Sequence, residues 1–449
     1  MRNNSNEQFK KMTETPILPL LVKLSVPTVI SMLVTNIYNL ADTAFVGKLG
    51  TSASGAVGIV FGYMSIIQAL GFMFGQGAGS VVSRLLGAKK HDEASITAST
   101  AFFFSMFLGI VCSLISLLVL DRLVMALGST ETILPYAKTY ISFILVAAPF
   151  MTSSFVLNNV LRYEGKAMLG MVGLLTGAIL NIAGDPIFMF VLNMGIAGAG
   201  LSTALSQIIS FMILLWMFVS GRTTAKLSPR FISFKPGVTF DIVTTGMPSL
   251  LRQGLTSYAT VLLNQRAGVY GDHAIAAMSI VSRIGFFVFS VALGIGQGFQ
   301  PISGFNFGAG KYRRVKEAYR TTFILGESLM AIAALAVFIN AGSLIGVFRD
   351  DPAVIEIGTR ALRIHAAALL FLPMCMVTEM LFQSTGHKLG ASMLSSLRSG
   401  LFFIPALLIL SQVRGLYGIE EAQPLAYVMA FVPAVFMMLW FFKNMPKEA

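Results

Sequence analysis

The chain has 449 residues, of which 55% are hydrophobic and only 12% are charged, whereas a soluble protein carries about a quarter charged residues. Apolar runs of about 20 residues or more recur along the whole length. This composition excludes a soluble globular protein and a barrel of short alternating strands, and it predicts an all-α polytopic membrane protein. The two cysteines, Cys112 and Cys375, lie within apolar runs, so no disulfide framework is expected.

The apolar runs predict twelve membrane-spanning helices. The polar opening, residues 1–15, is too long and too mixed for a signal peptide, so the first apolar run is expected to remain as a span. Residues 221–241 form the longest loop, and we take it as a cytoplasmic linker between two six-helix lobes, residues 1–220 and 242–449. The predicted spans lie near residues 20–46, 54–82, 95–120, 136–161, 167–192, 196–219, 242–266, 274–305, 318–341, 357–384, 389–411 and 424–442.

The basic charges follow the predicted topology. The net charge is +12, and 21 of the 32 Lys and Arg lie at the termini or around the loops after even-numbered spans, against 8 around the loops after odd-numbered spans. By the positive-inside rule, both termini are expected on the cytoplasmic side of a cell membrane. The lipid bilayer is the expected surrounding, and neither nucleic acid nor an obligate protein partner is implied.

The second half of the chain repeats the first. A constant offset aligns residues 46–88 with residues 267–309 without gaps, and 11 of the 43 positions are identical, including a Gly-Gln-Gly triplet that begins at Gly75 and again at Gly296. Each lobe has an even number of spans, so the two copies share one orientation and a pseudo-twofold axis along the membrane normal is expected. We interpret the repeated glycines as packing sites between helices.

Asp185 is an acid inside the apolar run from 167 to 192. A carboxylate at this depth must face other protein groups or water, and such residues are usually functional. Asn181 lies four residues earlier and shares the same helix face. Pro186 has no N–H, so the carbonyl of Ile182 is expected to lose its usual partner. Together these groups predict a cradle for a proton or a small cation, although the acid could also be a structural hydrogen-bonding group and the proline only a kink.

Asp42 is the second acid of this kind, and like Asp185 it is expected in the outer half of the membrane. The repeat places Leu263 opposite Asp42 and Ile404 opposite Asp185, so neither acid has a counterpart in the second half. Packing needs should be similar in both halves, and the asymmetry therefore favours function. If the two acids face one cavity, they cannot both be charged at low cost, so we expect them to share a proton.

Further polar residues surround these acids in the sequence. Asn39 precedes Asp42 by less than one helical turn, and Tyr140 lies at the outer start of the fourth span. Thr203 and Gln207 are four residues apart and form another polar pair on one face of the sixth span. Glu164, between two basic residues at the end of the fourth span, is expected to form a local ion pair, with a gating role as the alternative.

The second half carries its own buried charges, and we expect structural pairs among them. They are Arg252, Arg283, Glu327, Glu379 and Arg398.

Several chemistries have no signature in the sequence. There is no GxxxxGK[ST] loop for a nucleotide-driven pump and no GxSxG nucleophile elbow. The four histidines, His91, His273, His365 and His387, lack metal-ligand spacing. We therefore expect no metal site, no cofactor and no enzyme activity.

Three segments carry a family resemblance. Asp42-Thr43-Ala44-Phe45-Val46-Gly47 ends the first span, Leu161-Arg162-Tyr163-Glu164-Gly165 ends the fourth, and Asn181 to Pro186 lies in the fifth. With twelve spans in two halves, the chain resembles the multidrug and toxic compound extrusion (MATE) family, and most closely its prokaryotic members with an acid pair in the N-terminal half.

The resemblance implies an export antiporter that exchanges amphipathic, often cationic compounds for H⁺ or Na⁺ by rocking-type alternating access. It implies that Asp42 and Asp185 are the coupling acids, with Na⁺ as an alternative occupant to H⁺, and that Asn181, Thr203 and Tyr140 lie nearby. Some relatives use acids in the seventh and tenth spans instead. Here the seventh span has no acid, and Glu379 in the tenth is a loose positional match only.

Two other functions stay open at this point. A lipid-linked oligosaccharide flippase would need a cationic cavity, and Arg252, Arg283 and Arg398 keep that interpretation open. A membrane-embedded enzyme would need a nucleophile and base or a metal constellation, which the sequence does not contain. The sequence leaves open the choice between H⁺ and Na⁺, the cargo and the oligomeric state.

Overall fold

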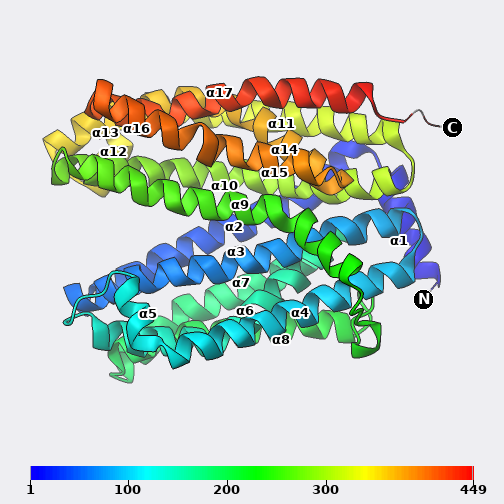
Figure 1. Ribbon diagram of the computed structural model, residues 1–449, viewed down its shortest axis with the longest axis horizontal. Helices are drawn as coiled ribbons and strands as arrows, with labels where there is room; N and C mark the ends of the chain where they lie inside the picture. The colour runs from blue at the N-terminus through cyan, green and yellow to red at the C-terminus, as the bar shows by residue number, and fades with distance from the viewer. Residues whose placement is uncertain (1, 447, 449) are drawn as a thin grey trace. The chain divides into compact units, whose positions relative to one another are not determined.

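A computed structural model describes residues 2–446 and 448, and the secondary structure of these residues is entirely helical (Figure 1). The helices are α1 (Arg2–Glu14), α2 (Ile17–Gly47), α3 (Thr51–Gly87), α4 (His91–Leu118), α5 (Leu120–Ala126), α6 (Leu134–Tyr163), α7 (Ala167–Pro186), η1 (Ile187–Val191), α8 (Gly195–Val219), η2 (Pro229–Phe231), α9 (Pro236–Gly268), α10 (Asp272–Gly308), α11 (Tyr312–Ile339), α12 (Ala341–Phe348), α13 (Pro352–Ala368), η3 (Leu369–Phe371), α14 (Leu372–Thr385), α15 (Lys388–Ser396), η4 (Leu397–Leu401), α16 (Phe403–Val413) and α17 (Leu416–Lys443).

Long helices stand at all twelve predicted places, and the prediction of an all-α membrane protein is confirmed. Within the described residues, eleven helical segments are long and apolar enough to cross a membrane. The twelfth predicted span is α9, whose 33 residues include Arg252 and a run of polar side chains. Its length suffices for a span of about 20 residues, but its composition is more polar than that of the other eleven.

The internal repeat is confirmed in the secondary structure. The offset that pairs residue 46 with residue 267 carries both ends of α3 onto both ends of α10, each 37 residues long. The same offset carries α4 onto α11, each 28 residues long. Both 37-residue helices follow a glycine with positive φ, Gly50 at 114° and Gly271 at 91°, a conformation that side chains other than glycine rarely adopt.

The chain forms two compact units. Unit 1 comprises Met1–Met12 and Ile30–Leu250, and unit 2 comprises Thr13–Val29 and Leu251–Ala449. The unit boundary therefore falls inside α1, α2 and α9. The crossings in α2 and α9 are equivalent positions of the repeat, and each follows a proline inside the helix, Pro27 in α2 and Pro248 in α9. The predicted lobe limits, residues 1–220 and 242–449, remain a prediction.

The last glycine of each Gly-Gln-Gly triplet packs against the helix segment that enters its unit from the other half of the chain. In unit 1, a Cβ at Gly77 would collide with the carbonyl of Ile242 on α9. In unit 2, a Cβ at Gly298 would collide with Ser25 on α2. The glycines thus allow close backbone approach, and their predicted packing role is confirmed.

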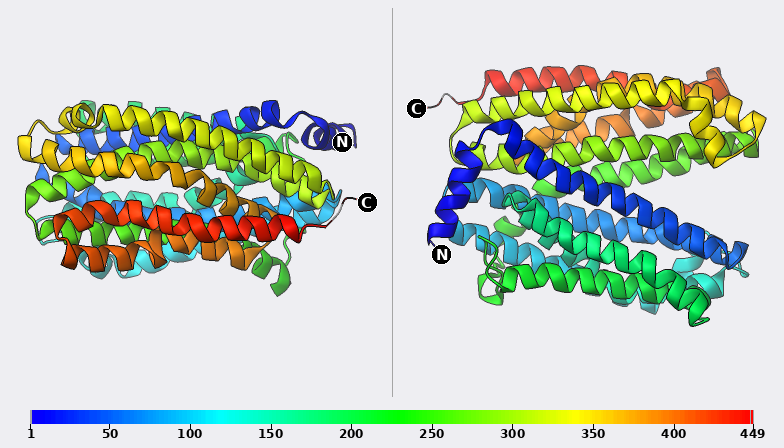
Figure 2. Two further views of the ribbon diagram at one scale, coloured as in Figure 1. Left: turned by 90° about the horizontal axis from the view of Figure 1, so that it is seen from above. Right: turned by 180° about the vertical axis from the view of Figure 1, so that it is seen from behind.

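One membrane span lies at the centre of each unit. In unit 1, α6 contacts α3, α4, α7 and α8, and two thirds of its most apolar window, 67%, is buried. The right-hand view of Figure 2 shows α7 and α8 of this unit side by side. In unit 2, α13 and α14 occupy the corresponding place in the repeat, with 78% of their window buried. Tyr140 near the start of α6 and Glu164 just after its end are therefore both held by the core of unit 1.

Candidate functional site

The end of α7 brings together the polar groups predicted from the fifth span. α7 ends at Pro186 and continues into the π-helical turn η1, a geometry that is frequent at functional sites. Asn181 Nδ2 donates to Asp185 Oδ1 at 3.3 Å and to Thr203 Oγ1 on α8 at 3.2 Å. Asp185 is completely buried. The predicted pairing of Asn181 with Asp185 on one helix face is confirmed.

Asp42 reaches the same place from α2. It is buried, and its carboxyl group lies close to Asp185 and Tyr140. Tyr140 in turn lies close to Thr203. The structure thus brings five predicted residues together in unit 1: Asp42, Tyr140, Asn181, Asp185 and Thr203. We call these five residues the acid cluster.

Two neighbours of the acid cluster were missed by the sequence analysis. Tyr38 is buried one helical turn before Asp42 on α2 and lies close to both acids. Ser202 on α8 donates to the backbone carbonyl of Asn181 at 3.3 Å and lies within reach of Asp185. The four-residue spacing that pairs Asn181 with Asp185 also pairs Tyr38 with Asp42, so the signal for the tyrosine was present.

The acid cluster contains acceptor oxygens without donors. Among the described residues, Asp42 Oδ1, Asp185 Oδ2 and Asn181 Oδ1 are buried and have no hydrogen-bond partner. Buried polar atoms are normally satisfied, so each such atom calls for an explanation. Three unsatisfied oxygens from two carboxyl groups and one amide are suited to accept a proton or to surround a small cation.

Two further predicted residues, Asn39 and Gln207, lie within about one helical turn of a member of the acid cluster on α2 and α8. Asn39 is half-buried, and its backbone carbonyl accepts a hydrogen bond from Thr43 Oγ1 at 2.8 Å. Gln207 is half-buried one turn after Thr203 on α8. Within the described residues, no hydrogen bond joins the side chain of either residue to the acid cluster, so their predicted contribution remains a prediction.

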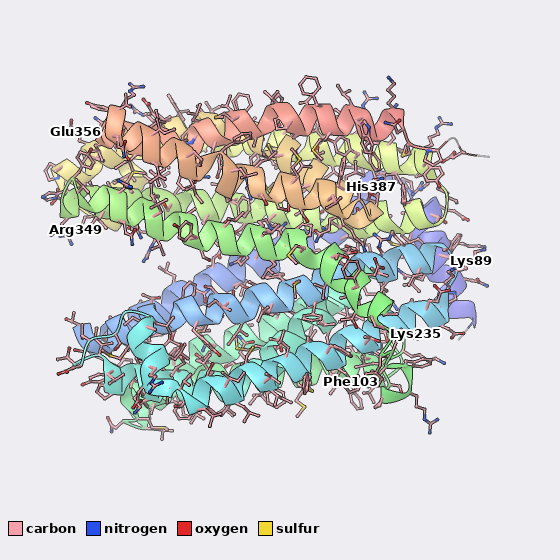
Figure 3. All side chains as sticks on the ribbon, viewed as in Figure 1. Lys89, Phe103, Lys235, Arg349, Glu356 and His387 are labelled. Carbon is pink, nitrogen blue, oxygen red and sulfur yellow. The ribbon has the colours of Figure 1, made fainter. Side chains whose placement is uncertain are left out.

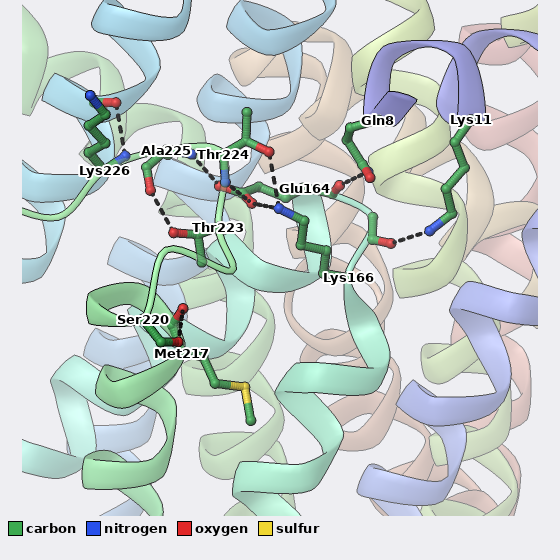
Figure 4. A network of polar contacts seen from close by, with 12 residues as sticks. Gln8, Lys11, Glu164, Lys166, Met217, Ser220, Thr223, Thr224, Ala225 and Lys226 are labelled. Carbon is green, nitrogen blue, oxygen red and sulfur yellow. Dashed lines mark hydrogen bonds and ion pairs between the residues drawn. The ribbon is translucent and has the colours of Figure 1, made fainter. Parts of the chain in front are cut away.

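Glu164 lies at the opposite end of α6 from Tyr140, about 36 Å away at 1.5 Å per residue, and is completely buried. Its carboxylate accepts from the Lys166 ammonium at 2.9 Å, which confirms the predicted local ion pair. It also accepts from the backbone N–H groups of Thr224 at 2.8 Å and Ala225 at 2.7 Å in the linker after α8 (Figure 4). The gating role remains a prediction.

Glu379 in unit 2 is engaged in a structural pair, as predicted. Arg252 Nη1 donates to Glu379 Oε1 at 2.5 Å, and Ser395 Oγ donates to the same oxygen at 2.7 Å. Arg398 is buried with its guanidinium 4.6 Å from the centre of the Phe289 ring. Glu379 therefore already has a cationic partner within the protein, unlike the carboxyl groups of the acid cluster.

A membrane protein with an internal repeat of long helices and a buried acid pair in one half has the organisation of a secondary transporter. The MatE family model matches residues 27–187 and 248–409, so the chain belongs to this family. The two matched segments begin at equivalent prolines, Pro27 and Pro248, as the repeat requires. The predicted family is confirmed, and the protein is a transporter and not an enzyme.

The chain is similar to proteins of known name and structure. It is 28% identical over 415 residues to the multidrug export protein MepA of Staphylococcus aureus strain N315, with 92% of each chain covered. It is 26% identical over the same length to MepA of Staphylococcus saprophyticus. Among solved structures, an outward-facing multidrug resistance MATE family transporter matches with a TM-score of 0.89 and 26% identity, over 96% of this chain and 98% of the other.

Proposed function

We propose that this protein is a multidrug efflux antiporter that exports amphipathic, often cationic compounds in exchange for H⁺ or Na⁺. Membership of the MatE family and similarity to multidrug export proteins support the export of small compounds. The observation that carries the exchange is the acid cluster, in which two buried carboxyl groups lie side by side with unsatisfied oxygens.

The exchange follows from competition for one site. Two carboxylates at close range repel each other in a medium of low dielectric constant, and a shared proton or a bound cation relieves the repulsion. A cationic substrate near the same carboxylates relieves it equally. The site therefore holds either the ion or the substrate, and the binding of one releases the other.

The surroundings of Asp185 offer a way to couple its charge state to helix geometry. The carboxyl group is followed at once by Pro186 and by the π-helical turn η1, where the regular helical hydrogen bonding is interrupted. A change in the charge of Asp185 would favour a different arrangement of this turn. In our proposal, this rearrangement accompanies alternating access of the rocking type, in a cell membrane with both termini on the cytoplasmic side.

A flippase would need a cationic cavity, but the three arginines that could form one either contact other side chains of the protein or are exposed. Arg252 is paired with Glu379, and Arg398 packs against an aromatic ring. Arg283 is exposed. No observation favours these three residues as a site for a pyrophosphate group, so we propose no second function.

The proposal is tested by efflux from proteoliposomes loaded with a fluorescent amphipathic cation. An imposed proton gradient and an imposed Na⁺ gradient are applied separately, so that the arm that drives efflux identifies the coupling ion. Asp42→Asn and Asp185→Asn should each abolish gradient-driven efflux while the protein remains folded. Asp121→Asn, at an exposed acid paired with Lys138, is the matched control and should transport normally. Normal efflux by both cluster variants would refute the proposal.

A further inference from the structure

Unit 2 has a groove that takes no part in the proposed exchange. It has a volume of about 720 Å³ and lies where the start of α15 meets α17. Its wall is apolar and contains Leu389, Met393, Phe436 and Trp440. The polar residues His387 and Lys388 mark one end, and the position of His387 can be followed in Figure 3. The volume is within the range of about 300–1,000 Å³ that is usual for ligand sites.

Local backbone features build this groove. α14 ends at Thr385. The next residue, Gly386, has a left-handed conformation with φ of 88°, and the chain turns there into α15. A Cβ at Gly390 would press on the Phe382 ring and lie 3.0 Å from the methyl carbon of Met437. The absence of a side chain at Gly390 therefore lets these groove-lining residues pack closely.

The polar end of the groove is held rigidly. The His387 ring makes edge contacts with four aromatic rings, with centroid distances from 5.1 to 6.4 Å. Its Nδ1 is 3.0 Å from Thr385 Oγ1. The groove is therefore formed before any ligand arrives, which lowers the entropic cost of binding.

The wall of the groove faces an apolar solvent. Leu389 is 88% exposed and Trp440 is 55% exposed, although both lie on membrane-spanning segments. Large apolar side chains exposed on such segments contact lipid chains, and a Trp near a helix end is typical of the membrane interface. The medium that surrounds this groove is therefore the bilayer itself.

Two lysines lie at the polar end of the groove. Lys388 lines the groove, and Lys443 follows Trp440 by less than one turn of α17. A phosphate would be attracted by these two cations, and basic pockets between membrane helices bind anionic headgroups.

We propose that this groove is a binding site for one anionic phospholipid. An acyl chain lies along Leu389 and Trp440, and the phosphate lies at Lys388. Through this site, unit 2 would bind anionic lipids in preference to neutral ones. This binding is separate from the ion and substrate exchange at the acid cluster in unit 1.

The site can be tested on the full-length protein by native mass spectrometry after exchange into phosphatidylglycerol or phosphatidylcholine. Wild type should retain phosphatidylglycerol in preference to phosphatidylcholine. Lys388→Gln should reduce that preference about fivefold, since one lysine near a membrane surface contributes about 1 kcal/mol. Lys388→Arg should keep it. Lys48→Gln, at an exposed lysine of unit 1, is the matched control and should have no effect.

A second variant tests the groove independently of the charge. Leu389→Trp fills the groove at a highly exposed position and should lower retention of both lipids. Equal retention of the two lipids by wild type would overturn the proposal, as would an unchanged preference in Lys388→Gln. Displacement of phosphatidylglycerol by the fluorescent cation used for efflux would make the groove a drug site and would overturn it too.

Discussion

Replacing Glu164 by glutamine should release the linker that follows α8. The carboxylate is completely buried and accepts from the backbone N–H groups of Thr224 at 2.8 Å and Ala225 at 2.7 Å, as well as from Lys166. Glutamine has only one acceptor oxygen, so one backbone N–H would face an NH₂ group instead. Lys166 would also lose its negative partner in the local pair.

The expected magnitude follows from these contacts. Losing one charge-assisted hydrogen bond to a buried group costs about 1.5–3 kcal/mol. Since each 1.4 kcal/mol is a factor of ten, the open population of the linker should rise about 10- to 100-fold. Hydrogen exchange of a peptide that contains Thr224 and Ala225 measures this directly, because exchange follows the local opening equilibrium.

Two controls make the test specific. Glu131→Gln, at an exposed acid, should leave exchange in the linker unchanged. Lys166→Gln should have a smaller effect than Glu164→Gln because both bonds from the linker N–H groups remain. If Glu164→Gln exchanges like the wild type, the carboxylate does not hold the linker and this reasoning is wrong.

Three other predictions follow from the fold. Glu379→Gln should destabilise the protein by about 3–5 kcal/mol because the buried Arg252 would lose its carboxylate partner. Chemical denaturation would measure this loss, and an unchanged midpoint would contradict the pairing. Gly246→Ala should lower thermal stability because its Cβ would collide with a backbone carbonyl of α3, and a melting temperature equal to that of the wild type would contradict this. A reporter inserted in residues 221–241 should be cytoplasmic and one at Asp350 external, and an external signal from the linker would overturn the predicted topology.

Sequence patterns predicted the parts of this protein that depend on short-range spacing. The four-residue interval between Asn181 and Asp185 predicted their contact, because residues at that spacing share a helix face. The apolar runs located the helices, but α11 begins at Tyr312, six residues before the predicted span at 318. The first turns of α11 carry basic residues, which lie outside the apolar run although they belong to the same helix.

Contacts between distant segments could not be predicted in the same way. The partners of Glu164 in the linker lie 60 and 61 residues away, and Arg252 lies 127 residues from Glu379. Composition does not specify which of many polar residues meet across helices. The crossing of α2 and α9 between units was also missed, although Pro27 and Pro248, which are equivalent in the repeat, were a signal for it.

The acid cluster was predicted in outline because its members are exceptional residues in apolar runs. Asp42 and Asp185 were singled out by their depth and by the absence of counterparts in the repeat. With the offset given by the helix starts Ala167 and Lys388, Asp185 aligns with Ala406, which is likewise not an acid. The unsatisfied oxygens of the cluster could not be predicted from the sequence, because hydrogen bonding depends on the groups that the neighbouring helices place beside them.

Ion release on substrate binding tests the central claim most directly. The purified protein, in weakly buffered solution containing a pH indicator or a Na⁺-selective electrode, is titrated with an amphipathic cation. Competition at the acid cluster predicts that about one H⁺ or Na⁺ is released per substrate bound, and that Asp42→Asn, Asp185→Asn and the double variant lose the release to a similar extent because the two acids act as one unit. Binding of the cation by wild type without release of either ion would contradict the account.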